Sequence, residues 1–239
     1  MTFRDIPGWT DYYRVIDFLV DHVPQHAHVV ELGPLLGRST VYIAQRMADT
    51  GRAGSITAVD LWPDSLREQP HLQDLAAANP DLRRTISSEL DRDTRWIFQR
   101  NVDACLGPDH PILVQTIRMD SVLASADQLD DHFDLVWIDD CHDHPHVRDE
   151  ILAWIPKVAP TGWIGGHDLD NPGVLRSLDE ALGPVMPMAY RPERDDHPEL
   201  VHAAWNRASW FMPASAARSR NRFHPPIAAE DGNPGEHQR

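Results

Sequence analysis

The stretch HVVELGPLLGRS (residues 28–39), together with SITAVD (55–60), decides the fold. Residues 28–32 are a short β-branched run, a glycine turn follows them, and a helix is expected from about Ser39. Residues 55–60 predict a second apolar strand. A strand, a helix and a strand in this order favour a parallel sheet with a right-handed crossover.

The rest of the chain continues this alternation. Apolar residues at helical spacing predict an amphipathic leading helix around residues 12–20, with Thr10 as its N-cap. Further helices are expected at about 92–105, 144–158 and 172–182, and further strands at 111–117, 133–138, 161–166, 185–190 and 203–212. The pattern predicts an α/β fold: a doubly wound, Rossmann-like, seven-stranded, mostly parallel sheet with an antiparallel last strand and helices on both faces.

The chain is expected to form one domain over residues 1–212. Residues 62–92 interrupt the alternation with a polar stretch that contains three prolines, and we interpret them as an insertion that covers the binding crevice as a lid, or else as a solvated excursion. From Pro213 the chain is rich in Ala, Ser, Arg, Pro and Gly, so residues 213–239 are expected to be a disordered tail.

The composition excludes several classes of function. The chain has 37 acidic and 22 basic residues and a formal net charge of −15, which argues against nucleic acid and against anionic membranes as partners. No stretch approaches the roughly 18 apolar residues of a membrane helix, and no signal peptide is recognisable. Two cysteines do not make a disulfide framework, so a cytoplasmic protein with a small-molecule substrate is expected.

Ligands of doubly wound folds bind at the carboxyl ends of the strands, so the residues that follow each strand are informative. Gly33 and Gly37 follow the first strand with the spacing G-x-x-x-G, and Asp60 ends the second, where a carboxylate can bind the two hydroxyls of a ribose. The dinucleotide pattern G-x-G-x-x-G needs a further glycine that is absent here. Met119-Asp120-Ser121 follow the third strand, and their polar groups suit an adenine edge.

This ordered set of strand ends resembles class I S-adenosylmethionine-dependent methyltransferases, over residues 29–212. More narrowly, it is similar to the branch that contains macrocin-type sugar O-methyltransferases and cephalosporin-hydroxylase-like proteins. The stretches that carry the resemblance are ELGPLLGRS (31–39), AVD (58–60), MDS (119–121), FDLVWIDDCHDHPHVRDEI (133–151) and PTGWIGGHDLD (160–170).

The resemblance implies S-adenosyl-L-methionine as the cofactor. Its methionine part would be lined by Glu31, Gly33, Gly37 and Ser39; its ribose would be held by Asp60, and its adenine would face Asp120 and Ser121. Pro34 departs from the family pattern, because it removes one backbone donor beside the first glycine. Trp62 directly follows the ribose position and is expected to border the adenine.

A metal site is expected at the ends of the next two strands. Asp139 ends the fourth strand and His167-Asp168 end the fifth, and these neighbouring ends could converge on Mg²⁺ or another divalent cation. Metal-dependent relatives such as catechol O-methyltransferase have an acidic pair where this chain has His167, and imidazole suits Zn²⁺, Fe²⁺ or Mn²⁺ better than Mg²⁺. In the alternative interpretation, Asp168 merely caps the helix near Pro172.

His142 stands three residues after Asp139, where macrocin-type relatives have a histidine that resembles a general base. A hydroxyl nucleophile must lose its proton, and a neutral imidazole can accept it near pH 7. His142 and Asp139 are therefore the catalytic candidates, while His144 and His146 are interpreted as bystanders and Cys141 as structural.

The leading hypothesis is an O-methyltransferase, with or without metal assistance, that acts on a hydroxyl of a small molecule such as a sugar or another natural product. Sugar-modifying relatives often assemble into oligomers, so a homo-oligomer is compatible with the resemblance. Two alternatives stay open: a non-catalytic, methyltransferase-like partner domain, and an NAD-dependent oxidoreductase.

Overall fold

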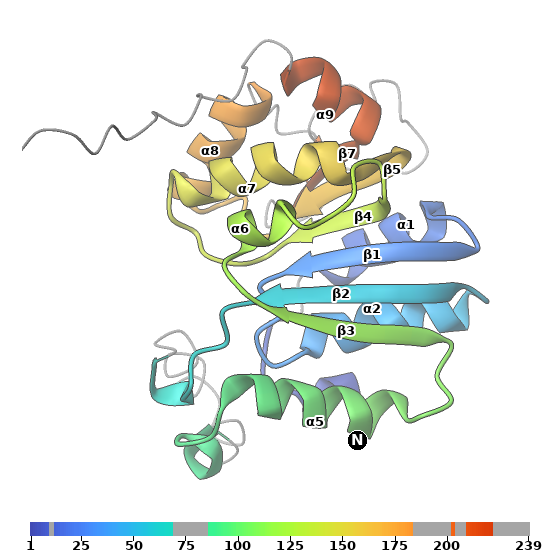
Figure 1. The fold of residues 1–239 in the computed structure, drawn as a ribbon, viewed down its shortest axis with the longest axis vertical. Coiled ribbons are helices and arrows are strands. Elements are labelled where there is room, and N and C mark those ends of the chain that lie inside the picture. Colours follow the sequence, from blue (N-terminus) through green and yellow to red (C-terminus); the bar gives the residue numbers. More distant parts are fainter. Residues whose placement is uncertain (10–11, 69–85, 184–201, 204–208, 222–239) are drawn as a thin grey trace, which may run out of the picture.

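The computed structural model describes residues 1–9, 12–68, 86–183, 202–203 and 209–221. Five parallel strands form the centre of its single sheet: β1 (His26–Leu32), β2 (Ala53–Asp60), β3 (Ile112–Arg118), β4 (Phe133–Ile138) and β5 (Val158–Gly166). The sheet order is β3-β2-β1-β4-β5-β7-β6, in which β7 (Trp210–Pro213) runs antiparallel to β5, and β6 (His202–Ala203) contributes two residues (Figure 1).

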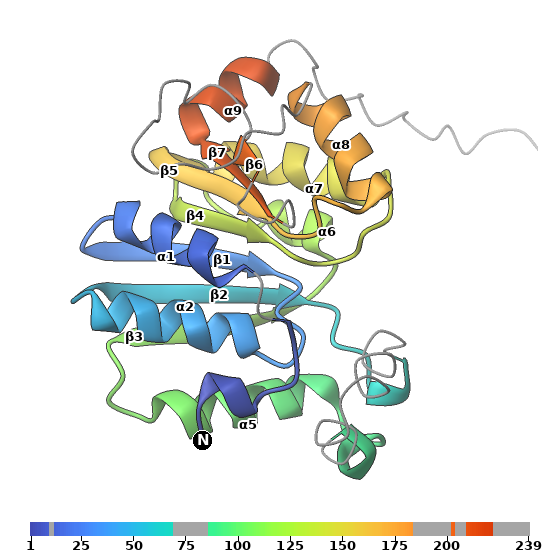
Figure 2. The ribbon, with the colours of Figure 1, turned by 180° about the vertical axis from the view of Figure 1, so that it is seen from behind.

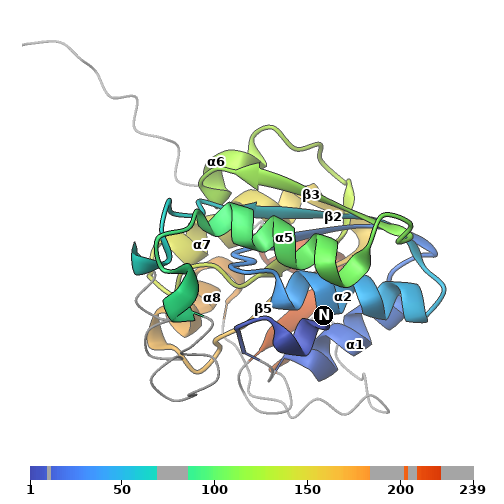
Figure 3. The same cartoon turned by 90° about the horizontal axis from the view of Figure 1, so that it is seen from below.

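Helices cover both faces of the sheet. On one face lie α1 (Tyr13–His22), α2 (Arg38–Asp49) and α5 (Thr94–Leu106), as Figures 2 and 3 show. On the other lie α6 (Ser121–Ser125), α7 (His146–Trp154), α8 (Pro172–Leu182) and α9 (Ala214–Asn221). The short 3-10 helices are η1 (Phe3–Asp5), η2 (Leu66–Glu68) and η3 (Ile155–Lys157).

Alternation along the central strands explains why two helical layers are needed. In β1, Val30 and Leu32 pack with α7 and α8, whereas Val29 and Ala27 pack with α1 and α2. Successive side chains of a strand point to opposite faces, so a strand such as β1, which has buried apolar side chains on both faces, must be covered on both. Because β1 to β5 are parallel, their carboxyl ends lie at one edge of the sheet, and the residues that follow them meet there.

The mixed, mostly parallel α/β sheet expected from the sequence is confirmed, and β4 and α8 have the predicted bounds. Among the described residues, six strands have four or more residues. Of the expected last pair, residues 185–190 and 204–208 lie outside the described part, and the described rest of the range 203–212 contains Ala203 of β6 and Trp210–Met212 of β7. Thr10 also lies outside the described residues. Val158 was expected to end a helix but begins β5, because Pro156 cannot continue the hydrogen bonds of α7.

The disordered tail expected from Pro213 is wrong for residues 214–221, which form α9. Ala214 and Ala217 are buried, Arg218 donates to the carbonyl oxygen of Val158, and Arg220 donates to that of Leu182 (2.8 Å). These tertiary contacts order a segment whose composition alone favours disorder. Residues 222–239 lie outside the described part.

The described ends of the expected lid, residues 62–68 and 86–92, pack against the body of the protein. Trp62, Leu66 and Ile86 are buried in one cluster with Phe98 of α5. The middle of the segment, residues 69–85, lies outside the described part, so the lid stays a prediction. Among the described helices, none has the length and apolar character needed to cross a membrane.

Candidate active site

The glycine turn after β1 brings the ends of β1 and β4 together. Gly33 has φ +77°, and a Cβ atom there would lie 2.3 Å from the carbonyl oxygen of Asp139. Gly37 has φ +91°, begins α2, and would place a Cβ atom 3.1 Å from the ring of Phe98. Both positions therefore require glycine for backbone conformation. Gly33 lies against the backbone of Asp139 and Asp140, just after β4, and it also lines the cleft.

Two carboxylates stand on the side of the site where the cofactor is expected. Glu31 is fully buried; its Oε2 accepts a hydrogen bond from Thr40 Oγ1 (2.5 Å), and its Oε1 has no hydrogen-bond partner among the described residues. Burial raises the pKa of Glu31 from 4.5 to about 7, although the hydroxyls of Ser39 and Thr40 lower it. A buried carboxylate oxygen without a donor is a place for a ligand's ammonium or hydroxyl group.

Asp60 is held at the mouth of the cleft by backbone donors. Its Oδ1 accepts from the N–H of Trp62 (2.7 Å) and its Oδ2 from that of Leu35 (3.2 Å). Burial raises the pKa of Asp60 from 3.8 to about 7, with Asp140 contributing in the same direction against these hydrogen bonds. Each oxygen retains acceptor capacity for a further donor.

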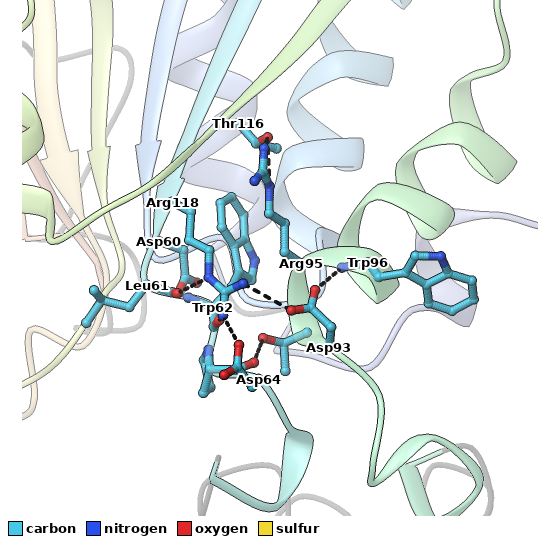
Figure 4. Close-up of polar contacts among 11 residues, drawn as sticks. Asp60, Leu61, Trp62, Asp64, Asp93, Arg95, Trp96, Thr116 and Arg118 are labelled. Atoms are coloured by element: carbon cyan, nitrogen blue, oxygen red, sulfur yellow. Dashed lines mark hydrogen bonds and ion pairs between the residues drawn. The ribbon is translucent and has the colours of Figure 1, made fainter.

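Arg118, at the end of β3, fixes the turn that carries Asp60 (Figure 4). Its guanidinium donates to the carbonyl oxygens of Leu61 (3.0 Å) and Trp62 (2.5 Å). It also forms ion pairs with Asp64 (2.5 Å) and with Asp93 (3.1 Å), the N-cap of α5. Contacts with two backbone carbonyl oxygens and two carboxylates link this turn to the start of α5.

Trp62, expected to border the adenine, packs into the core and is not among the residues that line the main cleft. Its side chain is 1% exposed, its Nε1–H donates to the carbonyl oxygen of Leu35 (2.9 Å), and its ring packs on Phe98 at 5.0 Å between centroids. A positive φ of 40° at Trp62 turns the chain as the side chain packs into the core. Leu61, 62% exposed, is the residue after Asp60 that faces solvent.

The polar side chains that follow β3 form hydrogen bonds within the protein. Asp120 is the N-cap of α6 and accepts from the N–H of Leu123 (3.0 Å). Ser121 is buried, and its hydroxyl donates to Glu150 of α7 (2.5 Å). Neither residue is among those that line the main cleft, so their expected contact with adenine stays a prediction.

The candidate catalytic residues converge after β4 and β5. His142 Nε2 donates to Asp168 Oδ2 at 2.6 Å, and His167 Nδ1 lies 3.2 Å from the same oxygen and 3.5 Å from Asp139 Oδ1. One potential ligand atom from each of Asp139, His167 and Asp168 lies within 4.8 Å of the others. The three residues predicted for the metal therefore meet, and His142 adjoins them.

Local backbone features hold this arrangement. Asp168 has φ +55°, in the left-handed region, and the N-cap of α8 is Asn171 rather than Asp168, since Asn171 Oδ1 accepts from the N–H of Gly173 (2.8 Å). Asp168 is therefore free of the capping role considered from the sequence. A Cβ atom on Gly173 would lie 2.2 Å from the carbonyl oxygen of His142, so this glycine lets α8 approach the His142 loop.

The residues of this catalytic group shift one another's pKa values. The hydrogen bond to Asp168 raises the pKa of His142. Burial raises the pKa of Asp168, but hydrogen bonds from His142 and His167 outweigh it and hold the pKa below its ordinary range. Burial raises the pKa of Asp139, which His167 partly offsets. A carboxylate that orients an imidazole in this way can serve proton transfer.

One cleft joins the two groups of residues. Of the predicted site residues it is lined by Gly33, Ser39, Asp60, Asp139, His142, His167 and Asp168, whereas Glu31, Gly37, Asp120 and Ser121 do not line it. Sequence reasoning missed the segment Pro7–Trp9, Tyr12 and Arg38, which also line the cleft. Arg38 donates to the carbonyl oxygens of Ile6 (2.9 Å) and Gly8 (3.1 Å), so it ties that segment down. No local sequence pattern predicts that the segment Pro7–Trp9 lines the cleft, because its contacts with Arg38 join parts of the chain that are far apart in the sequence.

A family model described as a methyltransferase domain matches residues 30–169, which is more than half of the chain. No curated protein matches the chain.

Solved structures with similar folds have low sequence identity to this chain. A Corynebacterium glutamicum protein is 14% identical, with a TM-score of 0.43, and the match covers 93% of this chain and 74% of that one. CalS11, described as a TDP-rhamnose 3'-O-methyltransferase of calicheamicin biosynthesis, is 15% identical, with a TM-score of 0.45 and coverage of 84% and 76%. A Burkholderia thailandensis 1,6-didemethyltoxoflavin N1-methyltransferase, with bound S-adenosylhomocysteine, is 20% identical, with a TM-score of 0.37 and coverage of 66% and 52%.

The match over residues 30–169 includes the glycine turn, Asp60 and the ends of β4 and β5, so the chain belongs to the methyltransferase domain family.

Proposed function

We propose that this methyltransferase transfers the methyl group to a hydroxyl oxygen of a small molecule, such as a sugar or another natural product. The observation that carries the proposal is the 2.6 Å contact between His142 and Asp168 in the cleft that Asp60 also lines. A hydroxyl is a weak nucleophile until its proton is removed, and a histidine oriented by a carboxylate suits that task.

The cleft fits S-adenosylmethionine on the side of β1 and β2. Asp60 would hold the ribose hydroxyls, and Gly33 and Ser39, which also line the cleft, would receive the methionine end. The cofactor supplies an electrophilic methyl group on a sulfonium. The protein orients the acceptor oxygen in line with that group, and His142 takes the proton on Nδ1 while Asp168, which accepts a hydrogen bond from Nε2–H, stabilises the resulting imidazolium.

Asp139, His167 and Asp168 fit a divalent cation, as one nitrogen and two carboxylate ligands. Such a cation would lower the pKa of the acceptor hydroxyl and position it. The donor set contains an imidazole, which favours Mn²⁺, Fe²⁺ or Zn²⁺ over Mg²⁺.

The test has two steps. Calorimetric titration with S-adenosylhomocysteine should show micromolar binding, while NAD should not bind. The enzyme is then incubated with methyl-labelled S-adenosylmethionine and a panel of hydroxylated sugars and natural products, with and without each divalent cation. A labelled methyl ether supports the proposal; transfer only to nitrogen or carbon acceptors in a matched panel would contradict O-methylation while leaving the family assignment intact.

A further inference from the structure

A second cluster of potential ligands lies where β4, α6 and α7 meet (Figure 1), and one of its members, Asp140, also lines the cleft. It consists of Asp140 just after β4, Ser121 at the start of α6, and His146 and Glu150 on α7. His146 and Glu150 are four residues apart, so they lie on one face of their helix. The cluster shares no residue with the group formed by Asp139, His142, His167 and Asp168.

Glu150 is the buried member of this cluster. Its side chain is 0% exposed; Oε1 accepts a hydrogen bond from Ser121 Oγ (2.5 Å), and Oε2 has no hydrogen-bond partner among the described residues. A buried carboxylate with an unsatisfied oxygen is costly, and such oxygens usually bind a donor or a cation. Its side chain points toward Asp140 and His146, with which it forms a candidate ligand set.

The spacing of the three candidate ligands is compatible with a metal ion. His146 Nε2 lies within hydrogen-bond distance of Ser121 Oγ (3.3 Å), but it is 3.8 Å from Asp140 Oδ2 and 3.7 Å from Glu150 Oε1, beyond hydrogen-bond range. Bonds of about 2.0–2.2 Å to a tetrahedral Zn²⁺ separate its ligands by roughly 3.4 Å. The ligand atoms of Asp140, His146 and Glu150 all lie within 4.8 Å of one another, so a small contraction would complete the site.

We propose that Asp140, His146 and Glu150 bind a divalent transition-metal ion, with the Ser121 hydroxyl or water as a further ligand. One imidazole and two carboxylates suit Zn²⁺, Mn²⁺ or Fe²⁺ rather than Ca²⁺. The ion compensates the buried charge of Glu150 and links β4, α6 and α7. It therefore acts as a structural ion, separate from any ion bound by Asp139, His167 and Asp168.

The test uses the full chain, stripped of metal by a chelator and dialysed, and titrated with Zn²⁺ alone by calorimetry. His146→Asn removes the imidazole ligand, and His167→Asn disables the other cluster. His144→Asn serves as the matched control, because His144 lies two residues before His146, just outside α7, and bonds to Glu180 instead (2.7 Å). The absorption spectrum of the Co²⁺ form gives a second readout, since its visible bands report the ligand geometry.

We expect one equivalent of Zn²⁺ to persist in His167→Asn and His144→Asn and to be lost, or bound at least tenfold more weakly, in His146→Asn. The Co²⁺ bands of that equivalent should disappear in His146→Asn. The same stoichiometry and a Kd within twofold of the parent in a folded His146→Asn protein would overturn the proposal. So would the absence of Zn²⁺ binding by the His167→Asn protein, or equal losses in His146→Asn and His144→Asn. Circular dichroism checks that each variant is folded.

Discussion

Asp60 and Asp168 lie in one cleft, each at or just after the end of a parallel strand, yet their pKa values shift in opposite directions. Burial raises the pKa of Asp60 to about 7, and the hydrogen bonds from the backbone N–H groups of Trp62 and Leu35 offset this rise only in part. Hydrogen bonds from His142 and His167 lower the pKa of Asp168 despite burial. The difference shows that the partners set by the fold, more than the residue type, decide what a carboxylate at a strand end can do.

The two sides of the cleft therefore suit different tasks. The side of Glu31 and Asp60 lacks a cationic partner bonded to either carboxylate among the described residues, so it can accept donors from a neutral or cationic ligand. On the other side of the cleft, a hydrogen bond already joins His142 Nε2 to the carboxylate of Asp168. If this division is right, variants on the first side should change cofactor affinity, and variants on the second should change turnover.

The largest effect is expected for His142→Gln. Removing the general base should lower kcat by about 10²–10⁴-fold, while the Kd for S-adenosylhomocysteine stays close to that of the parent. Single-turnover methyl transfer and calorimetry measure the two quantities. His132→Gln, at the opposite end of β4, is the control. A near-normal kcat in His142→Gln would show that His142 is not the general base. The proposed division of the cleft into a cofactor-binding side and a catalytic side would then be wrong.

The next effect concerns the stability of the cofactor-free protein in Glu31→Gln. The folded-state pKa of Glu31 is raised from 4.5 to about 7, so the folded state binds the proton more tightly and stability falls as pH rises through this interval. The advantage of Glu31→Gln in unfolding free energy should therefore be larger at pH 8 than at pH 4 by about 3 kcal/mol. Urea denaturation at both pH values measures it, and a pH-independent difference would show that Glu31 titrates normally.

Asp60→Ala should weaken S-adenosylhomocysteine binding by about 1–3 kcal/mol, because hydrogen bonds to a charged acceptor are lost. Calorimetric titration gives the value directly. Asp91→Ala, which removes an exposed partner of Arg67, controls for the change in net charge. Equal affinities for Asp60→Ala and the parent would exclude Asp60 from the ribose site.

The smallest effect is expected for Arg118→Ala, which releases the turn after Asp60 without removing the carboxylate. We expect the Kd for S-adenosylhomocysteine to rise by about 2–10-fold, the effect of one or two net hydrogen bonds. Arg95→Ala is the matched control, because Arg95 comes from the neighbouring helix but donates to Thr116 Oγ1 (2.7 Å; Figure 4). Similar affinities for the two variants would show that Arg118 does not position Asp60.

Patterns within a few residues were sufficient for the central part of the fold. The apolar run FDLVWI predicted β4 to the residue, and Pro172 with Gly183 marked the two ends of α8. Composition misled at residues 214–221, because the burial of Ala214 and the hydrogen bonds of Arg218 depend on β5 and on the segment that precedes it. His146 was interpreted as a bystander, but it meets Asp140 and Glu150 only because α7 packs beside the end of β4.

By itself the sequence determined which residues stand at the carboxyl ends of the strands, since strand periodicity and glycine turns are local properties of the chain. It thereby predicted that Asp60, Asp139, His142 and His167-Asp168 lie close together, and these residues line one cleft. Only the tertiary structure decided that Asp168 bonds to His142 across 26 residues, and that Trp9 and Tyr12 line the same cleft. Contacts between distant segments depend on how helices pack on the sheet, and a single sequence carries no local signal for that packing.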